Sequence, residues 1–299
     1  MTHPTRSNGL AAAIVAACAL ALSGCGKEAD TTADDAKKAD STGQASATPA
    51  TETRTLGDYE LRIRDLAGEG GKGQRAELLR NGTVAWSRQS ASFTIGGGRE
   101  DARESVGVHQ DITGDGTPDL VLIDHSGGAD CCSTFILLSL GQQVEELAVI
   151  DAGRGEGAHF ADLNRDGSFE FVGRDWTFSG WNATPANSPA PRIVLSWNGA
   201  FYELAPGLMR TSAPSDAKFE ELGLEMLGAQ SWSRGKPPAS YWAAALDFIY
   251  SGHRDTAERF LMLTWPEDVE GRDAFVAEFM RKLEESPYYA QLAQAQSGG

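Results

Sequence analysis

The spacing of hydrophobic and polar residues changes near residue 212, and this change predicts two kinds of structure. Before that point, apolar residues alternate with polar ones, as at 59–63, or form short runs such as 120–123 and 135–138. Alternation with a period of two predicts half-buried strands, whereas short apolar runs predict strands that are buried on both faces. The Asn-Gly pair at Asn81 and a second pair at Asn198 predict hairpin turns between strands.

Beyond residue 212 the spacing becomes helical. Trp242, Ala245, Leu246 and Ile249 lie at i, i+3, i+4 and i+7, which places them on one face of a helix. Gly252 follows at the position where such a helix would end. We therefore predict an α+β chain with an N-terminal antiparallel β domain at 56–212 and a small C-terminal α-helical bundle at 213–299.

An acidic loop occurs twice in the β half, beginning at Asp111 and again at Asp162, 51 residues later. Both copies have oxygen-bearing side chains at positions 1, 3, 5 and 9, and Gly at position 6. Because Ca²⁺ takes ~6–8 oxygen ligands and needs a tight turn to collect them from one segment, the pattern favours calcium. The alternative interpretation is that both segments are plain Asp/Gly turns. The predicted ligands are Asp111, Thr113, Asp115 and Asp119 with the Thr117 carbonyl, and Asp162, Asn164, Asp166 and Glu170 with the Ser168 carbonyl.

The residues around the loops argue against an EF-hand. That site needs a bidentate Glu at position 12 and flanking helices, but this chain has Leu122 and Gly173 there, and apolar runs typical of strands follow. A period of about 50 residues suggests repeated β units, and three would fit between 57 and 210. Three units are too few for a closed propeller of ~4–8 blades. We expect either a partial propeller-like array of sheets or a compact β domain.

The pattern Asp-x-Asx/Thr-x-Asp-Gly-x-x-Asp/Glu, followed by an apolar run, resembles the FG-GAP repeat of integrin alpha subunits and of many bacterial surface proteins. The resemblance covers the two loops and the strands predicted after them. It implies a calcium ion bound at each loop, a structural or adhesive role, and no catalysis.

The first 24 residues have the order of a signal peptide. Arg6 precedes an apolar run at 10–22, which is too short to span a bilayer comfortably and ends in Leu22-Ser23-Gly24-Cys25. This tetrapeptide resembles the bacterial lipobox, which implies cleavage before Cys25 and attachment of a diacylglycerol and a further acyl chain such as palmitate. Several acyl chains anchor a protein stably in a membrane. An ordinary cleavable signal peptide with a chance Cys is the alternative.

The segment at 25–55 is polar after the Cys and contains too little apolar surface to fold, so we predict a disordered tether. Gly26 follows Cys25, whereas an Asp at that position would resemble the signal for retention in the inner membrane. This favours the outer membrane of a bacterial cell envelope. Apart from Cys18 and Cys25, only Cys131 and Cys132 remain. In an oxidising compartment they form either a strained vicinal disulfide or two buried thiols.

Charge and motifs limit the function. A formal net charge of −16 argues against binding nucleic acid through a basic face. The chain contains no Gly-x-Ser-x-Gly or His-Glu-x-x-His motif. We therefore predict a non-enzymatic, calcium-stabilised binding or scaffold module, anchored to the membrane at Cys25, with an envelope protein or a glycan as its partner. The alternative is a metal-dependent envelope hydrolase acting on a glycan or a phosphoester.

Overall fold

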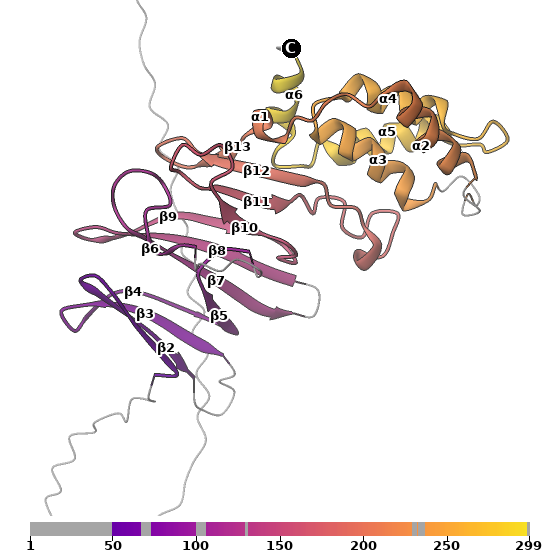
Figure 1. Ribbon diagram of the computed structural model, residues 1–299. Coiled ribbons are helices and arrows are strands. Elements are labelled where there is room, and N and C mark those ends of the chain that lie inside the picture. The colour runs from indigo at the N-terminus through magenta and orange to yellow at the C-terminus, as the bar shows by residue number, and fades with distance from the viewer. Residues whose placement is uncertain are drawn as a thin grey trace, which may run out of the picture. The chain divides into compact units, whose positions relative to one another are not determined.

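The computed structural model describes residues 50–66, 73–99, 106–128, 131–228, 232 and 237–297, with the side chains of Cys131 and of residues 296 and 297 left out. Within these ranges the chain is α+β, with antiparallel sheets in the N-terminal part and helices at the C-terminus, as predicted (Figure 1). The predicted signal peptide, Cys25 and most of the predicted tether (25–55) lie outside the described residues. The end of that segment is not a tether, because Glu52–Leu56 form a strand that pairs with Tyr59–Ile63. The boundaries predicted for the domains stay predictions.

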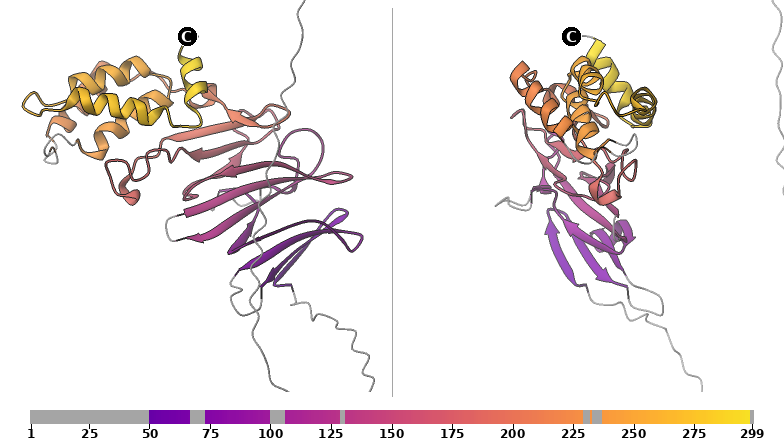
Figure 2. Two further views of the ribbon diagram at one scale, coloured as in Figure 1. Left: turned by 180° about the vertical axis from the view of Figure 1, so that it is seen from behind. Right: turned by 90° about the vertical axis from the view of Figure 1, so that its right-hand side faces the viewer.

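The strands form three antiparallel sheets, which follow one another along the chain (Figures 1 and 2). The first sheet has the order β1 (Glu52–Leu56), β2 (Tyr59–Asp65), β3 (Gln74–Arg80) and β4 (Thr83–Ser90). The second has the order β5 (Ser92–Ile95), β7 (Asp119–Gly128), β8 (Cys131–Leu140) and β9 (Val144–Asp151), and β6 (Val108–Gln110) also pairs with β7. The third has the order β10 (His159–Ala161), β11 (Glu170–Arg174), β12 (Arg192–Trp197) and β13 (Tyr202–Leu204). No closed barrel or propeller forms in the described part of the chain, so the propeller-like arrangement is not confirmed.

The second sheet is apolar on both faces because it packs against both of the other sheets. Leu120 of β7 is buried with residues of the first sheet, whereas its neighbour Val121 is buried with residues of the third. On the second of these faces, Phe135 of β8 contacts the rings of Phe160 and Phe171 at centroid distances of 6.0 and 5.1 Å. A strand that is covered on both faces has no polar face, which explains the unbroken apolar runs in the sequence.

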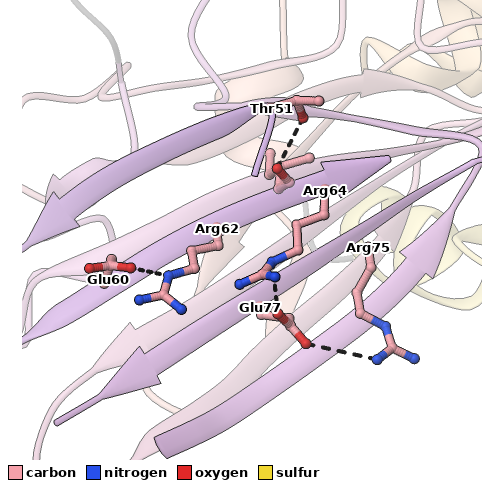
Figure 3. A network of polar contacts seen from close by, with 7 residues as sticks. Thr51, Glu60, Arg62, Arg64, Arg75 and Glu77 are labelled. Carbon is pink, nitrogen blue, oxygen red and sulfur yellow. Dashed lines mark hydrogen bonds and ion pairs between the residues drawn. The ribbon is translucent and has the colours of Figure 1, made fainter. Parts of the chain in front are cut away.

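The first sheet shows the opposite pattern, with one apolar and one polar face. Leu61 and Ile63 of β2 face the second sheet and are buried. The side chains between and beside them form ion pairs on the other face, where Arg64 and Arg75 both approach Glu77, at 3.6 and 3.8 Å (Figure 3). These ion pairs are half-buried and lie within the first sheet, so the contact of this sheet with the second one is made by its apolar face.

The helices begin directly after the third sheet. They are α1 (Pro206–Met209), α2 (Asp216–Gly228), α3 (Ala239–Tyr250), α4 (Arg254–Leu263), α5 (Arg272–Leu283) and α6 (Tyr289–Ser297), with a short 3₁₀ helix at Pro185–Asn187 before β12. The predicted apolar stripe lies on α3, where Trp242, Ala245, Leu246 and Ile249 are buried. Gly252 follows α3 with a φ of 88°, a conformation that suits glycine at a helix end. None of the described helices has the length and apolar character needed to cross a membrane.

Aromatic side chains join the helices to the third sheet. Phe178 and Trp181, in the segment after β11, contact Trp242 of α3 and Phe275 of α5, with ring centroids 5.5 and 5.3 Å apart. The same hydrophobic core also contains Leu195 of β12. The core therefore continues across the predicted boundary at residue 212.

A buried carboxylate reinforces this junction. Asp175 is 3 % exposed, and its Oδ1 accepts hydrogen bonds from the N–H and the hydroxyl of Thr177 at 2.8 and 2.6 Å. Its Oδ2 accepts bonds from the hydroxyls of Tyr250 and Ser286, the latter at 2.5 Å. Burial, and then the charge of Asp175, raises the pKa of Tyr250 above its ordinary value, so this phenol stays a neutral donor. The carboxylate ties the end of β11 to α3 and to the turn before α6.

We expect Asp175→Ala to lower the free energy of unfolding by about 3 kcal/mol, since each buried donor left without an acceptor costs about 1–3 kcal/mol. Urea unfolding followed by tryptophan fluorescence measures this loss. The exposed Asp268 supplies a control, and Asp268→Ala should change stability by less than about 0.5 kcal/mol. Equal stability of the two variants would contradict the role given to Asp175.

Candidate metal centre

Strand pairing places the two acidic loops in equivalent positions. The first loop connects β6 to β7, and the second connects β10 to β11, each as a hairpin within one sheet. Gln110 pairs with Asp119 in the first hairpin, and Ala161 pairs with Glu170 in the second. The residue before each loop therefore faces the acidic residue at position 9.

The first loop wraps around the carboxylate of Asp111. Its Oδ1 accepts hydrogen bonds from the N–H groups of Gly114 and Asp115 at 2.7 and 3.2 Å, and its Oδ2 accepts one from Gly116 at 2.8 Å. Gly114 and Gly116 have φ values of 76° and 87°, which glycine adopts without strain. Asp115 in turn accepts a bond from the N–H of Thr117 at 2.7 Å. Positions 1 and 5 thus bring their carboxylates to the same tight turn.

Asp119 closes the other end of the first loop and is fully buried. Its Oδ2 accepts bonds from the N–H groups of Ile112 and Thr113 at 2.8 and 3.2 Å. Its Oδ1 and the hydroxyl of Thr113, which is 6 % exposed, have no hydrogen-bond partner among the described residues. Burial raises the pKa of Asp119 to about 6, helped by the charges of Asp115 and Asp111 and opposed by the two N–H donors. Two buried oxygens, at positions 9 and 3, are therefore available to a cation.

The second loop repeats this arrangement. Asp162 accepts hydrogen bonds from the N–H groups at loop positions 4, 5 and 6, at 2.6, 3.2 and 3.3 Å. Glu170, which is 2 % exposed, closes the loop by accepting a bond from the N–H of Leu163 at 2.8 Å. Burial, and then the charges of the neighbouring aspartates, raises the pKa of Glu170. In both copies, therefore, the carboxylate at position 1 accepts the N–H groups of the turn, and the carboxylate at position 9 accepts the N–H of position 2.

The two loops differ in the hydrogen bonds that join positions 3, 5 and 7. Asp166 Oδ1 accepts bonds from the N–H and hydroxyl of Ser168 at 2.8 and 2.9 Å, and its Oδ2 accepts one from the amide of Asn164 at 2.7 Å. These bonds, with the Ser168 N–H contributing most, lower the pKa of Asp166. The second loop thus pairs its polar side chains internally, whereas the first leaves two buried oxygens unpaired.

The two loops contact each other, which the sequence did not predict. The N–H of Phe169 in the second loop donates to the carbonyl of Ile112 in the first at 2.8 Å. A Cβ added to Gly114 would lie 3.4 Å from both Cβ and Oγ of Ser168. The Tyr202 hydroxyl of β13 donates to the Phe169 carbonyl at 3.0 Å. The six carboxylates, three from each loop, therefore belong to one acidic region.

The hydroxyl of Tyr202 lies close enough to both loops for their charges to affect its pKa. Burial, and then the charges of Asp119 and Glu170, raises the pKa of its phenol. Tyr202 and Ile112 were absent from the predicted site, because the contact joins segments that are distant in sequence. One available signal was that position 2 is apolar in both copies, Ile112 in the first and Leu163 in the second.

The side chains of the first loop fit Ca²⁺ by their chemistry. A carboxylate has about four acceptor positions, so Asp111 can accept three N–H groups and still bind a cation. In the described residues, no group of three or more His, Cys, Asp and Glu side chains is arranged as a metal site. The loop carboxylates point to backbone N–H groups instead, so calcium binding requires some of them to rotate toward the ion. The calcium prediction is not tested by this arrangement.

The remaining predicted residues are the cysteines. Cys25 lies outside the described residues. Cys132 is disulfide-bonded, but the side chain of Cys131 is not described, so the vicinal disulfide stays a prediction. No family model, no curated protein and no solved structure is significantly similar to the chain.

In calcium-free buffer, we expect Asp119→Ala to lower the free energy of unfolding by about 2 kcal/mol, because the N–H groups of Ile112 and Thr113 lose their acceptor. Asp119→Asn keeps an acceptor oxygen and should cost less than about 1 kcal/mol. Urea unfolding in excess EDTA measures both values. If the two variants lose the same stability, Asp119 does not stabilise the loop by accepting the N–H groups of Ile112 and Thr113.

Proposed function

We propose that the protein is a bacterial envelope lipoprotein that acts as a non-enzymatic, calcium-stabilised binding or scaffold module. One observation carries the calcium part of the proposal. Asp119 Oδ1 and the Thr113 hydroxyl are buried and have no hydrogen-bond partner among the described residues, and the same loop carries the carboxylates of Asp111 and Asp115. A buried acceptor without a partner costs about 1–3 kcal/mol, and a cation at this position would remove that cost.

In this proposal each loop holds one ion. The first uses side-chain oxygens of Asp111, Thr113, Asp115 and Asp119 with the Thr117 carbonyl, and the second uses Asp162, Asn164, Asp166 and Glu170 with the Ser168 carbonyl. Calcium supplies charge neutralisation and fixed loop geometry, and its binding energy adds to the stability of the folded state. The three consecutive antiparallel sheets support a partial propeller-like array similar to FG-GAP repeats.

The envelope location rests on the N-terminal sequence. Residues 1–24 would be removed as a signal peptide, Cys25 would carry the lipid, and the polar segment between Cys25 and β1 would hold the sheets away from the membrane. We place the anchor in the outer membrane because Gly26 follows the Cys. An envelope protein or a glycan is the proposed partner.

We expect about 10 mM Ca²⁺ to raise the melting temperature of the purified protein by at least about 5 °C relative to EDTA. A ligand at 100 times its dissociation constant stabilises by about 2.7 kcal/mol, and 1 kcal/mol shifts the melting temperature of a domain of this size by about 2–4 °C. Differential scanning calorimetry measures the shift. Equimolar Mg²⁺ should give a smaller one, because it keeps its waters and demands octahedral geometry.

Two double variants test whether the calcium-dependent rise in melting temperature comes from the loops. Asp115→Ala combined with Asp166→Ala should abolish the calcium-dependent shift, since each substitution removes the position-5 ligand of one loop. Glu220→Ala combined with Glu225→Ala removes two exposed carboxylates from α2 and should leave the shift intact. An unchanged melting temperature in calcium would refute the calcium part of the proposal.

We expect Cys25→Ser to prevent incorporation of labelled fatty acid and to move the protein from the membrane fraction to the soluble fraction of the expressing bacterium. The thiol is the acceptor of the diacylglycerol, and loss of the acyl chains removes the anchor. Cys18→Ser changes the other N-terminal Cys and should leave labelling and fractionation unchanged. Labelling that persists in Cys25→Ser would refute the lipoprotein assignment.

A further inference from the structure

We propose that strand β9 binds an extended segment of a partner protein, which pairs with the open edge of β9 as a further strand of the second sheet. This inference rests on the proposed binding function and selects a protein, rather than a glycan, as the partner. It depends on three features of the molecule, which are the open backbone edge of β9, the apolar character of that edge and an aromatic cleft beside it.

The backbone of β9 has one edge without a partner strand. β9 is the last strand in the order of the second sheet, and no strand of the described residues pairs with its other edge. The N–H of Ala152 donates to the carbonyl of Ser133, next to β9, at 2.9 Å. Because successive N–H groups alternate in direction along an antiparallel strand, that of Ile150 points to β8, whereas those of Val149 and Asp151 point away from it. These outward groups can pair with one more strand.

The second half of β9 lacks the features that protect an exposed strand edge. Proteins protect such edges with charged residues, prolines and bulges. In the first half of β9, Glu145 and Glu146 are charged and exposed, and the register with β8 shifts beside them. The segment 147–150 contains neither a charged residue nor a proline, and Val149 within it is 47 % exposed. An apolar edge of this kind favours pairing with another chain.

A cleft of about 640 Å³ lies beside this segment. It is lined by residues 147–151 of β9 and, among others, by four aromatic residues from later in the chain, Trp176, Phe201, Tyr202 and Tyr288. Trp176 is held in place, since its indole N–H donates to the carbonyl of Ala152 at 3.0 Å and the guanidinium of Arg154 lies 5.5 Å from its ring centroid. Phe201 is 54 % exposed, so its ring is available to a ligand. Alternate side chains of a bound strand point to one face, and those on the face toward the cleft can pack on these rings.

Charge determines which kind of segment fits. β9 carries Glu145, Glu146 and Asp151, which are exposed, and no cationic residue. An extended segment that alternates apolar residues with Lys or Arg complements this edge. A second copy of β9 would instead place carboxylates opposite carboxylates, which destabilises a strand pair. A glycan does not have the regularly spaced N–H and C=O groups that pairing with a strand edge requires.

Two substitutions at one position separate the backbone contribution from that of the side chain. Val149→Pro removes an N–H that points away from β8, and proline is tolerated on edge strands at such positions. Val149→Ala shortens the same side chain and keeps the N–H. A difference in peptide affinity between these two variants therefore reports the pairing of the edge.

The experiment selects peptides from a phage-displayed library of short random sequences on the purified protein, and measures their dissociation constants by fluorescence polarisation. We expect the selected peptides to alternate apolar and basic residues. They should bind Val149→Pro at least about tenfold more weakly than the unmodified protein, because a backbone hydrogen bond is lost and the ring hinders pairing. Their affinity for Val149→Ala should change by less than about threefold.

Methylation of the peptide amides gives a second measurement that needs no protein variant. A peptide paired with β9 directs every second N–H toward it. Methylation of those amides should abolish binding, whereas methylation of the amides between them should leave binding intact. If Val149→Pro does not fold, as judged by circular dichroism, this pattern decides the question, and the absence of a period of two overturns the proposal.

The remaining outcomes are distinct from a failure of the proposed function. If no peptide is enriched, or if the enriched peptides bind Val149→Pro as tightly as the unmodified protein, the proposal is overturned. It is also overturned if sedimentation shows a dimer that Val149→Pro dissociates. If chitohexaose, and none of the peptides, quenches the tryptophan fluorescence and Trp176→Ala abolishes this quenching, the cleft binds a glycan, which overturns the peptide proposal and leaves the binding function standing. Calorimetry in calcium and fatty-acid labelling test the other parts of the proposed function independently.

Discussion

Apolar side chains on both faces of β7 and β8 hold the first and the third sheet against the second, and the position of every other element depends on this packing. On the face toward the third sheet, Phe135 meets Phe160 and Phe171 at the strands that flank the second acidic loop. The first acidic loop leads directly into β7. Packing of these sheets therefore brings two segments 51 residues apart into hydrogen-bonding contact.

Carboxylates that lie close together repel one another, and the two loops offset this repulsion in different ways. Backbone N–H groups surround position 1 in both copies, which offsets the repulsion between neighbouring aspartates. In the second loop, Asn164 and Ser168 also donate to Asp166, so that loop is largely satisfied by its own groups. In the first loop, Asp119 and Thr113 are buried with unpaired oxygens in the described structure. The first loop therefore has more to gain from a cation than the second.

Local patterns in the sequence predicted much of the fold. The stripe on α3 and the turns at Asn81 and Asn198 were correct, because each depends on residues close together in the chain. The ligand pattern was also local, so both loops could be recognised as repeats. Their mutual contact could not be predicted, since it depends on how one sheet packs on another. The same limit applies to Asp175, whose partners Tyr250 and Ser286 lie 75 and 111 residues away.

Pro118 determines which of the two loops can donate the hydrogen bond between them. Phe169 can donate its N–H to the preceding loop, but proline at the equivalent position of the first loop has no N–H to donate. Its carbonyl instead accepts a bond from Leu140 within the same sheet at 2.8 Å. A further loop-bearing unit placed before β6 could not be joined by the bond that joins the existing two. The backbone chemistry of this residue thus fixes the direction of the contact: position 8 of the second loop donates to the first loop, and position 8 of the first loop cannot donate in return.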